Sequence, residues 1–106
     1  MNDQLPCQVR VLAFDIDIVD WKPHDARGKF GEFSSLENII RVDFSTDKIN
    51  VVDTLLHEIN HAIYWAYGID DEDKEERTVA TFSSAWVQVY RDNPWLIEFI
   101  KSKLQE

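Results

Sequence analysis

The stretch from Asp47 to Gly68 constrains the fold of this sequence more than any other. Apolar residues recur along it at intervals of three and four positions, which is the period of a helix with one buried face. They are Val51, Val52, Leu55, Leu56, Ile59, Ala62, Ile63 and Ala66. Ser45, Thr46 and Asp47 are candidate N-caps, and Gly68 suits the position just past the last turn. The stretch therefore predicts a strongly amphipathic helix.

The residues before this helix have the patterns of strands. Residues 8–21, "QVRVLAFDIDIVDW", alternate apolar and acidic side chains in their second half, which predicts one long strand with a single buried face. Residues 22–31 carry a proline and two glycines and are typical of a turn-rich connection. Residues 37–44, "ENIIRVDF", are rich in β-branched side chains and predict a second strand. This strand–loop–strand pattern predicts a small antiparallel sheet.

Two further helices are predicted after the first. Apolar residues repeat at helical spacing through residues 75–91, which predicts the second helix. Pro94 disfavours helix at the residue before it and suits the first turn of a new one, so residues 95–104 are predicted to form a short C-terminal helix. The chain has 106 residues, of which 44% are hydrophobic, and this length suits one small core. We therefore expect one α+β domain over residues 1–106.

Charge and cysteine content exclude several classes of protein. The net charge is −9, from 20 acidic and 11 basic residues, so nucleic acid is not expected as a partner. The acidic excess lies mainly at 70–76, which is typical of a solvated loop and helix start. Cys7 is the single cysteine, which excludes an intrachain disulfide and fits a reducing compartment. No apolar run approaches a membrane span and no signal pattern opens the chain, so we expect a cytoplasmic protein without a membrane partner.

The motif His57-Glu58-Ile59-Asn60-His61 lies in the middle of the first predicted helix. Residues four apart on a helix share a face, so His57 and His61 can direct both imidazoles at one metal ion. Glu58 is adjacent to the first of them and can take a proton from a water that zinc activates. Ordinary surface histidines are the alternative, but the apolar neighbours would make unpaired imidazoles costly. The motif therefore predicts a zinc site with its own general base.

A catalytic zinc site usually has three protein ligands and one open position. His24 is one candidate for the third ligand, although it lies in the connection before the sheet is complete. A carboxylate at the start of the next helix is the better candidate, and Glu75 and Glu76 both occur there. If that helix folds back alongside the first and buries Val79 and Phe82, such a glutamate points into the same groove as the histidines.

The segment "HEINH", followed by a glutamate that opens the next helix, resembles the gluzincin branch of the zinc metallopeptidases. Residues 76–83, "ERTVATFS", are similar to the glutamate-bearing helix of that branch when Glu76 is the ligand, because Phe82 then falls at the sixth position. Glu75 gives a poorer match. The resemblance covers about residues 30–90 and is closest to ImmA/IrrE and SprT-like domains and to short zincin-like proteins of bacteriophages.

The resemblance implies a minimal zincin-like fold, in which a small sheet precedes the motif helix, the glutamate-bearing helix and a short C-terminal helix. It implies that His57, His61 and Glu76 bind Zn²⁺ and that Glu58 is the general base that activates the metal-bound water for peptide-bond hydrolysis. Several gluzincins carry Asp or Asn four residues after the ligand glutamate, where this chain has Ala80. The carboxylate or amide that orients a histidine in those proteins is therefore missing at that position.

Other residues are candidates for supporting roles. Asp53, one turn before His57, is a candidate to orient that histidine, with an ordinary surface aspartate as the alternative. The three tyrosines are candidates either for oxyanion stabilisation or for packing, and the four tryptophans are expected mainly in packing. The strand at 37–44 is a candidate edge for docking an extended peptide, or it only completes the sheet.

Three functions are consistent with the sequence. The first is a zinc-dependent peptidase that acts on a peptide or protein substrate. The second is a zincin-fold binding or regulatory module that keeps zinc with little or no turnover; small size and Ala80 favour it, whereas Glu58 favours the enzyme. The third is a structural metal domain in which the acidic run at 70–76 completes the coordination sphere. The sequence gives no indication of whether the protein is a monomer or an oligomer.

Overall fold

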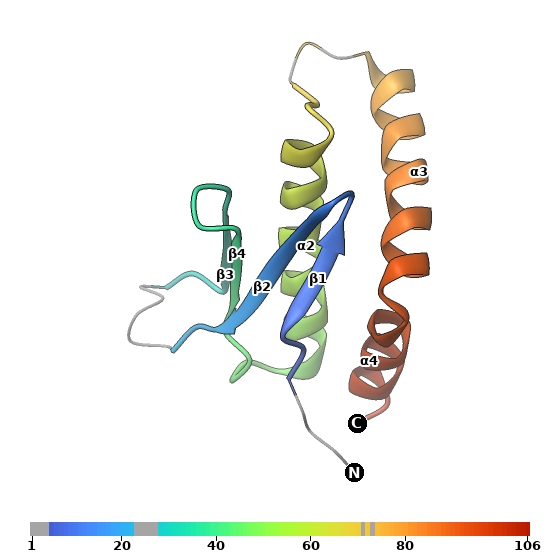
Figure 1. Cartoon of the computed structure of the whole chain (residues 1–106). Coiled ribbons are helices and arrows are strands. Elements are labelled where there is room, and N and C mark those ends of the chain that lie inside the picture. The colour runs from blue at the N-terminus through green and yellow to red at the C-terminus, as the bar shows by residue number, and fades with distance from the viewer. Residues whose placement is uncertain (1–4, 23–27, 71, 73) are drawn as a thin grey trace.

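The computed structural model describes residues 5–22, 28–70, 72 and 74–106. Within them a sheet of four strands is followed by three helices, so the α+β class predicted from the sequence is confirmed (Figure 1). The strands are β1 (Gln8–Val11), β2 (Phe14–Asp20), β3 (Gly31–Ser34) and β4 (Ile39–Val42). The helices are α2 (Lys48–Ala66), α3 (Glu75–Asp92) and α4 (Pro94–Leu104).

The long strand predicted over residues 8–21 is wrong, because the chain turns back on itself in the middle of it. β1 and β2 form an antiparallel hairpin in which Val11 pairs with Phe14. Leu12 occupies the turn with a φ of 53°, a conformation that a non-glycine residue adopts only when its surroundings hold it there. The backbone N–H of Leu12 donates to Gln88 Oε1 at 2.8 Å, which is one such restraint. The sequence has no glycine or asparagine here to signal the turn.

The antiparallel sheet predicted from the sequence is also corrected, because the observed sheet is mixed. Its strand order is β1-β2-β4-β3, with β2 and β4 parallel and the two outer pairs antiparallel. β3 was predicted partly as loop, and it forms a hairpin with β4. β4 therefore lies between two neighbours, and β3 is the strand at this edge of the sheet. The prediction that 37–44 offers an edge to a peptide is wrong for this reason.

The predicted 47–68 helix is confirmed as α2. Its N-cap is Asp47, whose side chain accepts a hydrogen bond from the Asn50 backbone N–H at 2.9 Å. Gly68 follows the C-cap with a φ of 65°, in the left-handed region that glycine adopts without strain. Helix α2 lies against one face of the sheet and buries its apolar stripe there (Figure 1). The core that results contains Val9, Val11, Ile16, Ile18, Ile40, Val42, Leu55, Ile59, Ala62, Ile63, Ala85, Val89 and Leu96.

Helices α3 and α4 have nearly the predicted bounds, and Pro94 opens α4 as predicted. The predicted packing of α3 is only partly correct. Its first turns do not bury Val79, which is 54% exposed, and its deepest residues are Ala85 and Val89, further along the helix. Helix α3 packs beside β1, at the opposite end of the sheet from β3 (Figure 1). This position decides which predicted site residues can meet.

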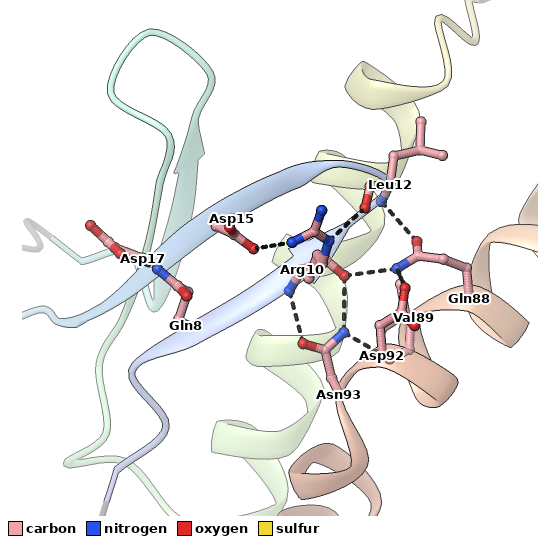
Figure 2. Close-up of polar contacts among 9 residues, drawn as sticks. All are labelled: Gln8, Arg10, Leu12, Asp15, Asp17, Gln88, Val89, Asp92 and Asn93. Carbon is pink, nitrogen blue, oxygen red and sulfur yellow. Dashed lines mark hydrogen bonds and ion pairs between the residues drawn. The ribbon is translucent and has the colours of Figure 1, made fainter.

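The side-chain amides of Gln88, on α3, and of Asn93, directly after α3, form hydrogen bonds with the backbone of β1 and of the turn that follows it (Figure 2). Asn93 Oδ1 accepts from the Arg10 N–H at 2.8 Å, and Asn93 Nδ2 donates to the Arg10 carbonyl at 2.9 Å. Gln88 binds the backbone of Arg10 and Leu12 in the same manner. These amides occupy the positions that a further strand would take, so they cover the β1 edge of the sheet.

In the described part of the chain, no helix combines the length and the apolar character that crossing a membrane requires.

Candidate functional site

His57 and His61 lie one above the other on the same face of α2, and their rings meet through their Nε2 atoms. Their Nε2 atoms are 3.1 Å apart, and the ring planes are inclined by 78°. Two Zn–N bonds of about 2.05 Å at a tetrahedral angle would place two nitrogens about 3.3 Å apart. The separation of the two nitrogens therefore fits a hydrogen bond between the rings and is also close to that of a metal chelate.

Glu58 lies beside this pair, on the side of α2 that faces the sheet. Its side chain is 5% exposed, although it is the charged residue of the motif. Burial raises the pKa of Glu58 above its ordinary value, and Glu32 on β3 adds to the rise, while the charges of His61 and His57 act in the opposite direction. A carboxyl with a raised pKa holds a proton more readily, which is a property of general bases and acids in active sites.

Gly31 permits a close approach between β3 and the motif helix. A Cβ atom at this position would lie 2.6 Å from Thr54 Cγ2, 2.9 Å from the Arg41 carbonyl oxygen and 3.2 Å from Glu58 Cγ. Real Cβ atoms do not approach other atoms this closely, so no other residue fits here without displacement. Because Gly31 has no side chain, the edge strand can lie directly against Glu58.

A cavity of about 550 Å³ opens between β3 and α2 and contains the whole motif face. It is lined by Lys29, Gly31, Glu32, Phe33, Ser35, His57, Glu58, His61 and Trp65. A second cavity of about 330 Å³ continues along α2 towards its N-terminus. The two cavities share Lys29, Gly31, His57 and Glu58. Glu58 and His57 therefore lie in the middle of one groove between the edge strand and the helix.

Glu76, the predicted third zinc ligand, is not brought to the histidines. It lies exposed in the first turn of α3. Helix α3 meets α2 ten residues later, where Trp86 Nε1 donates to Asn60 Oδ1 at 3.0 Å, and ten residues correspond to about 15 Å of helix. Glu76 is thus displaced along the helix axis from His61 and lies on the β1 side of α2.

The fit of these residues to a zinc ion is therefore incomplete. The paired Nε2 atoms match two ligand positions. Across residues 5–22, 28–70, 72 and 74–106, however, no three His, Cys, Asp or Glu side chains are arranged to hold one metal ion. Glu75 shares the exposed first turn of α3 with Glu76, and His24 lies outside the described residues. The structure supplies two ligands of a site that usually has three.

The predicted supporting residues are only partly present at the site. Asp53 is exposed and lines the second cavity with His57. None of the three tyrosines lines either cavity, and Tyr90 instead contacts Trp86 on α3, with ring centroids 5.2 Å apart. Of the tryptophans, which were expected mainly in packing, Trp65 is the one that lines the cavity. Five residues that line the first cavity are not among the site residues predicted from the sequence, and a glycine inside a strand is the one signal that indicates a close approach. They are Lys29, Gly31, Glu32, Phe33 and Ser35.

Comparisons of the chain with protein family models, with curated proteins and with solved structures give no match.

Proposed function

We propose that this protein is a zinc-dependent peptidase in which His57 and His61 bind the metal and Glu58 is the general base. The observation that carries the proposal is the convergence of two Nε2 atoms, 3.1 Å apart, beside a buried carboxyl on the same helix. When bound, zinc would polarise a peptide carbonyl and lower the pKa of water. Glu76 stays a prediction as the third ligand, and its position on α3 counts against it.

Glu58 has the chemistry that this function requires of the protein itself. Its carboxylate would accept a proton from the attacking water and deliver it to the nitrogen of the leaving amine. The raised pKa of Glu58 suits both steps, because the group must take up a proton and hold it until the peptide bond breaks. Its burial also limits competition from bulk water.

The edge strand β3 supports a peptide as the substrate. The Phe30 carbonyl accepts a hydrogen bond from the Asp43 N–H at 2.8 Å, so these two residues form a hydrogen-bonded pair across the hairpin. Such pairs alternate along an antiparallel ladder, and the backbone groups of Gly31 and Phe33 therefore point away from β4. Both residues line the cavity that contains the motif. An extended peptide could form main-chain hydrogen bonds to them beside Glu58.

A zinc-retaining binding module is the second candidate function. The observation that favours it is the lack of a third ligand among the residues that the structure describes, since catalytic zinc sites usually have three. The same groove would then bind a peptide without cleaving it. Glu58 counts against this candidate, because peptide binding alone requires no buried carboxyl at this position.

Cleavage of a mixed peptide library by wild type and by Glu58→Gln separates the two candidates. The substitution keeps the size of the side chain and removes the base, so cleavage should fall at least a hundredfold while zinc content and fold persist. Glu98→Gln is the matched control, because Glu98 is an exposed residue of α4 outside the groove. Equal and negligible cleavage by wild type and Glu58→Gln would reject the peptidase and leave the binding module.

A further inference from the structure

Three aromatic side chains form a shelf at one end of the groove. Trp65 contacts Phe14 and Phe33, with ring centroids 4.7 and 5.8 Å apart. We call Phe14, Phe33 and Trp65 the aromatic shelf. Trp65 is 38% exposed and Phe14 is 37% exposed, so much of this apolar surface is left uncovered. Trp65 lies one turn beyond His61 on α2, which places the shelf directly beside the motif.

The register of β3 determines which side chain of a bound peptide would reach the shelf. Phe33 pairs with Ile40, which is fully buried, and it packs against the core on the α2 side of the sheet. Glu32 points to the opposite face, where its carboxylate binds Arg41 at 2.7 Å. Side chains directly opposite one another on paired strands share a face. A peptide residue opposite Phe33 would therefore place its side chain over the shelf.

The peptide residue opposite Gly31 would lie two positions from the peptide residue opposite Phe33. Gly31 packs directly against Thr54 and Glu58 without a side chain of its own, and the strand period of two puts the peptide residue opposite Gly31 on the α2 side as well. The peptide residue at this position would face Glu58. The backbone groups that orient the peptide belong to the same two residues, Gly31 and Phe33.

We propose that the groove selects extended peptides that carry a large apolar side chain, preferably aromatic, on the aromatic shelf, two residues from the residue that faces Glu58. This inference rests on the peptidase function proposed above. Pairing of β3 with the β3 of a second copy is the competing occupant, and the net charge of −9 on each chain opposes it. A neutral or basic peptide meets no such repulsion.

Fluorescence anisotropy of labelled hexapeptides tests the proposal with the chelator-treated, full-length chain. The peptides have a Gly/Ala background and differ at a single guest position, which is Phe, Leu, Ala or Lys. The Phe peptide should bind at least about tenfold more tightly than the Ala peptide, because burying an aromatic ring on the shelf removes its apolar surface from water. Trp65→Ala should reduce this preference to less than about twofold.

Tyr90→Ala is the matched control. Tyr90 is 37% exposed and contacts a second aromatic ring, as Trp65 does, but it lies on α3 outside both cavities. The control should keep the full preference for Phe. Trp65→Leu is measured in parallel, because it keeps an apolar side chain and preserves the fold if the alanine variant does not; its preference should lie between those of wild type and Trp65→Ala.

Four results would overturn the inference. They are equal binding of all four guests, an unchanged preference after substitution of Trp65, no binding of any peptide, and a dimer in sedimentation that dissociates when β3 is altered. Cleavage is measured separately on the same peptides. Selective binding without cleavage would leave this inference standing and reject the peptidase. Cleavage without selectivity would reject this inference and leave the peptidase.

Discussion

His57 and His61 direct their Nε2 atoms to within 3.1 Å of each other across one turn of α2. The four-residue spacing on one helix places both rings on the same face, and the tertiary structure adds the remaining features around them. The edge strand β3 approaches α2 at Gly31, and Glu58 is buried beside this contact. A local motif and a long-range contact therefore define the site together.

The buried carboxyl of Glu58 makes the stability of the metal-free protein depend on pH. Its raised pKa means that the folded state binds the proton more tightly than the unfolded state. Stability is therefore lost as pH rises from the ordinary pKa of a glutamate through the raised pKa in the folded protein. Glu58→Gln cannot ionise, so we expect it to have a higher free energy of unfolding than wild type at pH 7 to 8, measured by urea denaturation with chelator present.

The difference between the two proteins should shrink as the pH falls and should vanish below the ordinary range of a glutamate. Glu98→Gln, which changes an exposed residue, should show no such difference at any pH. A gap between wild type and Glu58→Gln that is constant from pH 4 to pH 8 would refute burial as the cause.

Gly31→Ala should destabilise the protein by about 1–3 kcal/mol, because the added methyl group would overlap Thr54 and the Arg41 carbonyl oxygen. Thr54→Ala in the same chain removes one of these two obstacles, so the double variant should recover part of the loss. Chemical denaturation of the single and double variants measures both effects. Full stability of Gly31→Ala alone would mean that β3 does not lie this close to α2.

Asn93→Ala should cost about 2–3 kcal/mol of stability, since Asn93 is 3% exposed and makes three hydrogen bonds to the backbone of Arg10 and Val89. It would also uncover the β1 edge, so the variant should aggregate more readily on partial unfolding. Asn60→Ala is the comparison, because that amide accepts a single, exposed hydrogen bond from Trp86 and should cost less than about 1 kcal/mol. Equal losses for the two variants would contradict a role for Asn93 in holding the edge.

Glu76→Ala should lower zinc affinity far less than His57→Ala, because Glu76 lies in the exposed first turn of α3, on the β1 side of α2. Isothermal titration of both variants with zinc makes the comparison. If the two substitutions weaken binding equally, the first turns of α3 must move to the histidines when zinc binds.

The sequence predicted the parts of the fold whose signals are local. The bounds of α2 followed from its apolar period, Asp47 and Gly68, and the bounds of α3 and α4 from their apolar period and Pro94. It missed the turn at Leu12, because the restraint on that residue comes from Gln88, which is 76 positions away in the chain. It also missed β3, a four-residue strand that follows a turn-rich segment.

The candidate site also has a local part, which the sequence predicts, and a part that depends on tertiary packing. The relation among His57, Glu58 and His61 follows from helix geometry and could be predicted. The position of Glu76 depends on where α3 packs, and the amides that attach α3 to β1 have no signature in the sequence. The roles of Gly31 and Trp65 depend on the path of the edge strand, which only the three-dimensional structure shows.

Zinc titration of the metal-free protein decides whether the two histidines form a metal site. We expect one zinc ion per chain by calorimetry and by metal analysis. His57→Ala and His61→Ala should each weaken binding by more than ~100-fold, because losing only a hydrogen-bond partner of a metal ligand already costs about 10–100-fold. Absence of zinc binding, or zinc binding that both histidine substitutions leave unchanged, would show that His57 and His61 are not metal ligands.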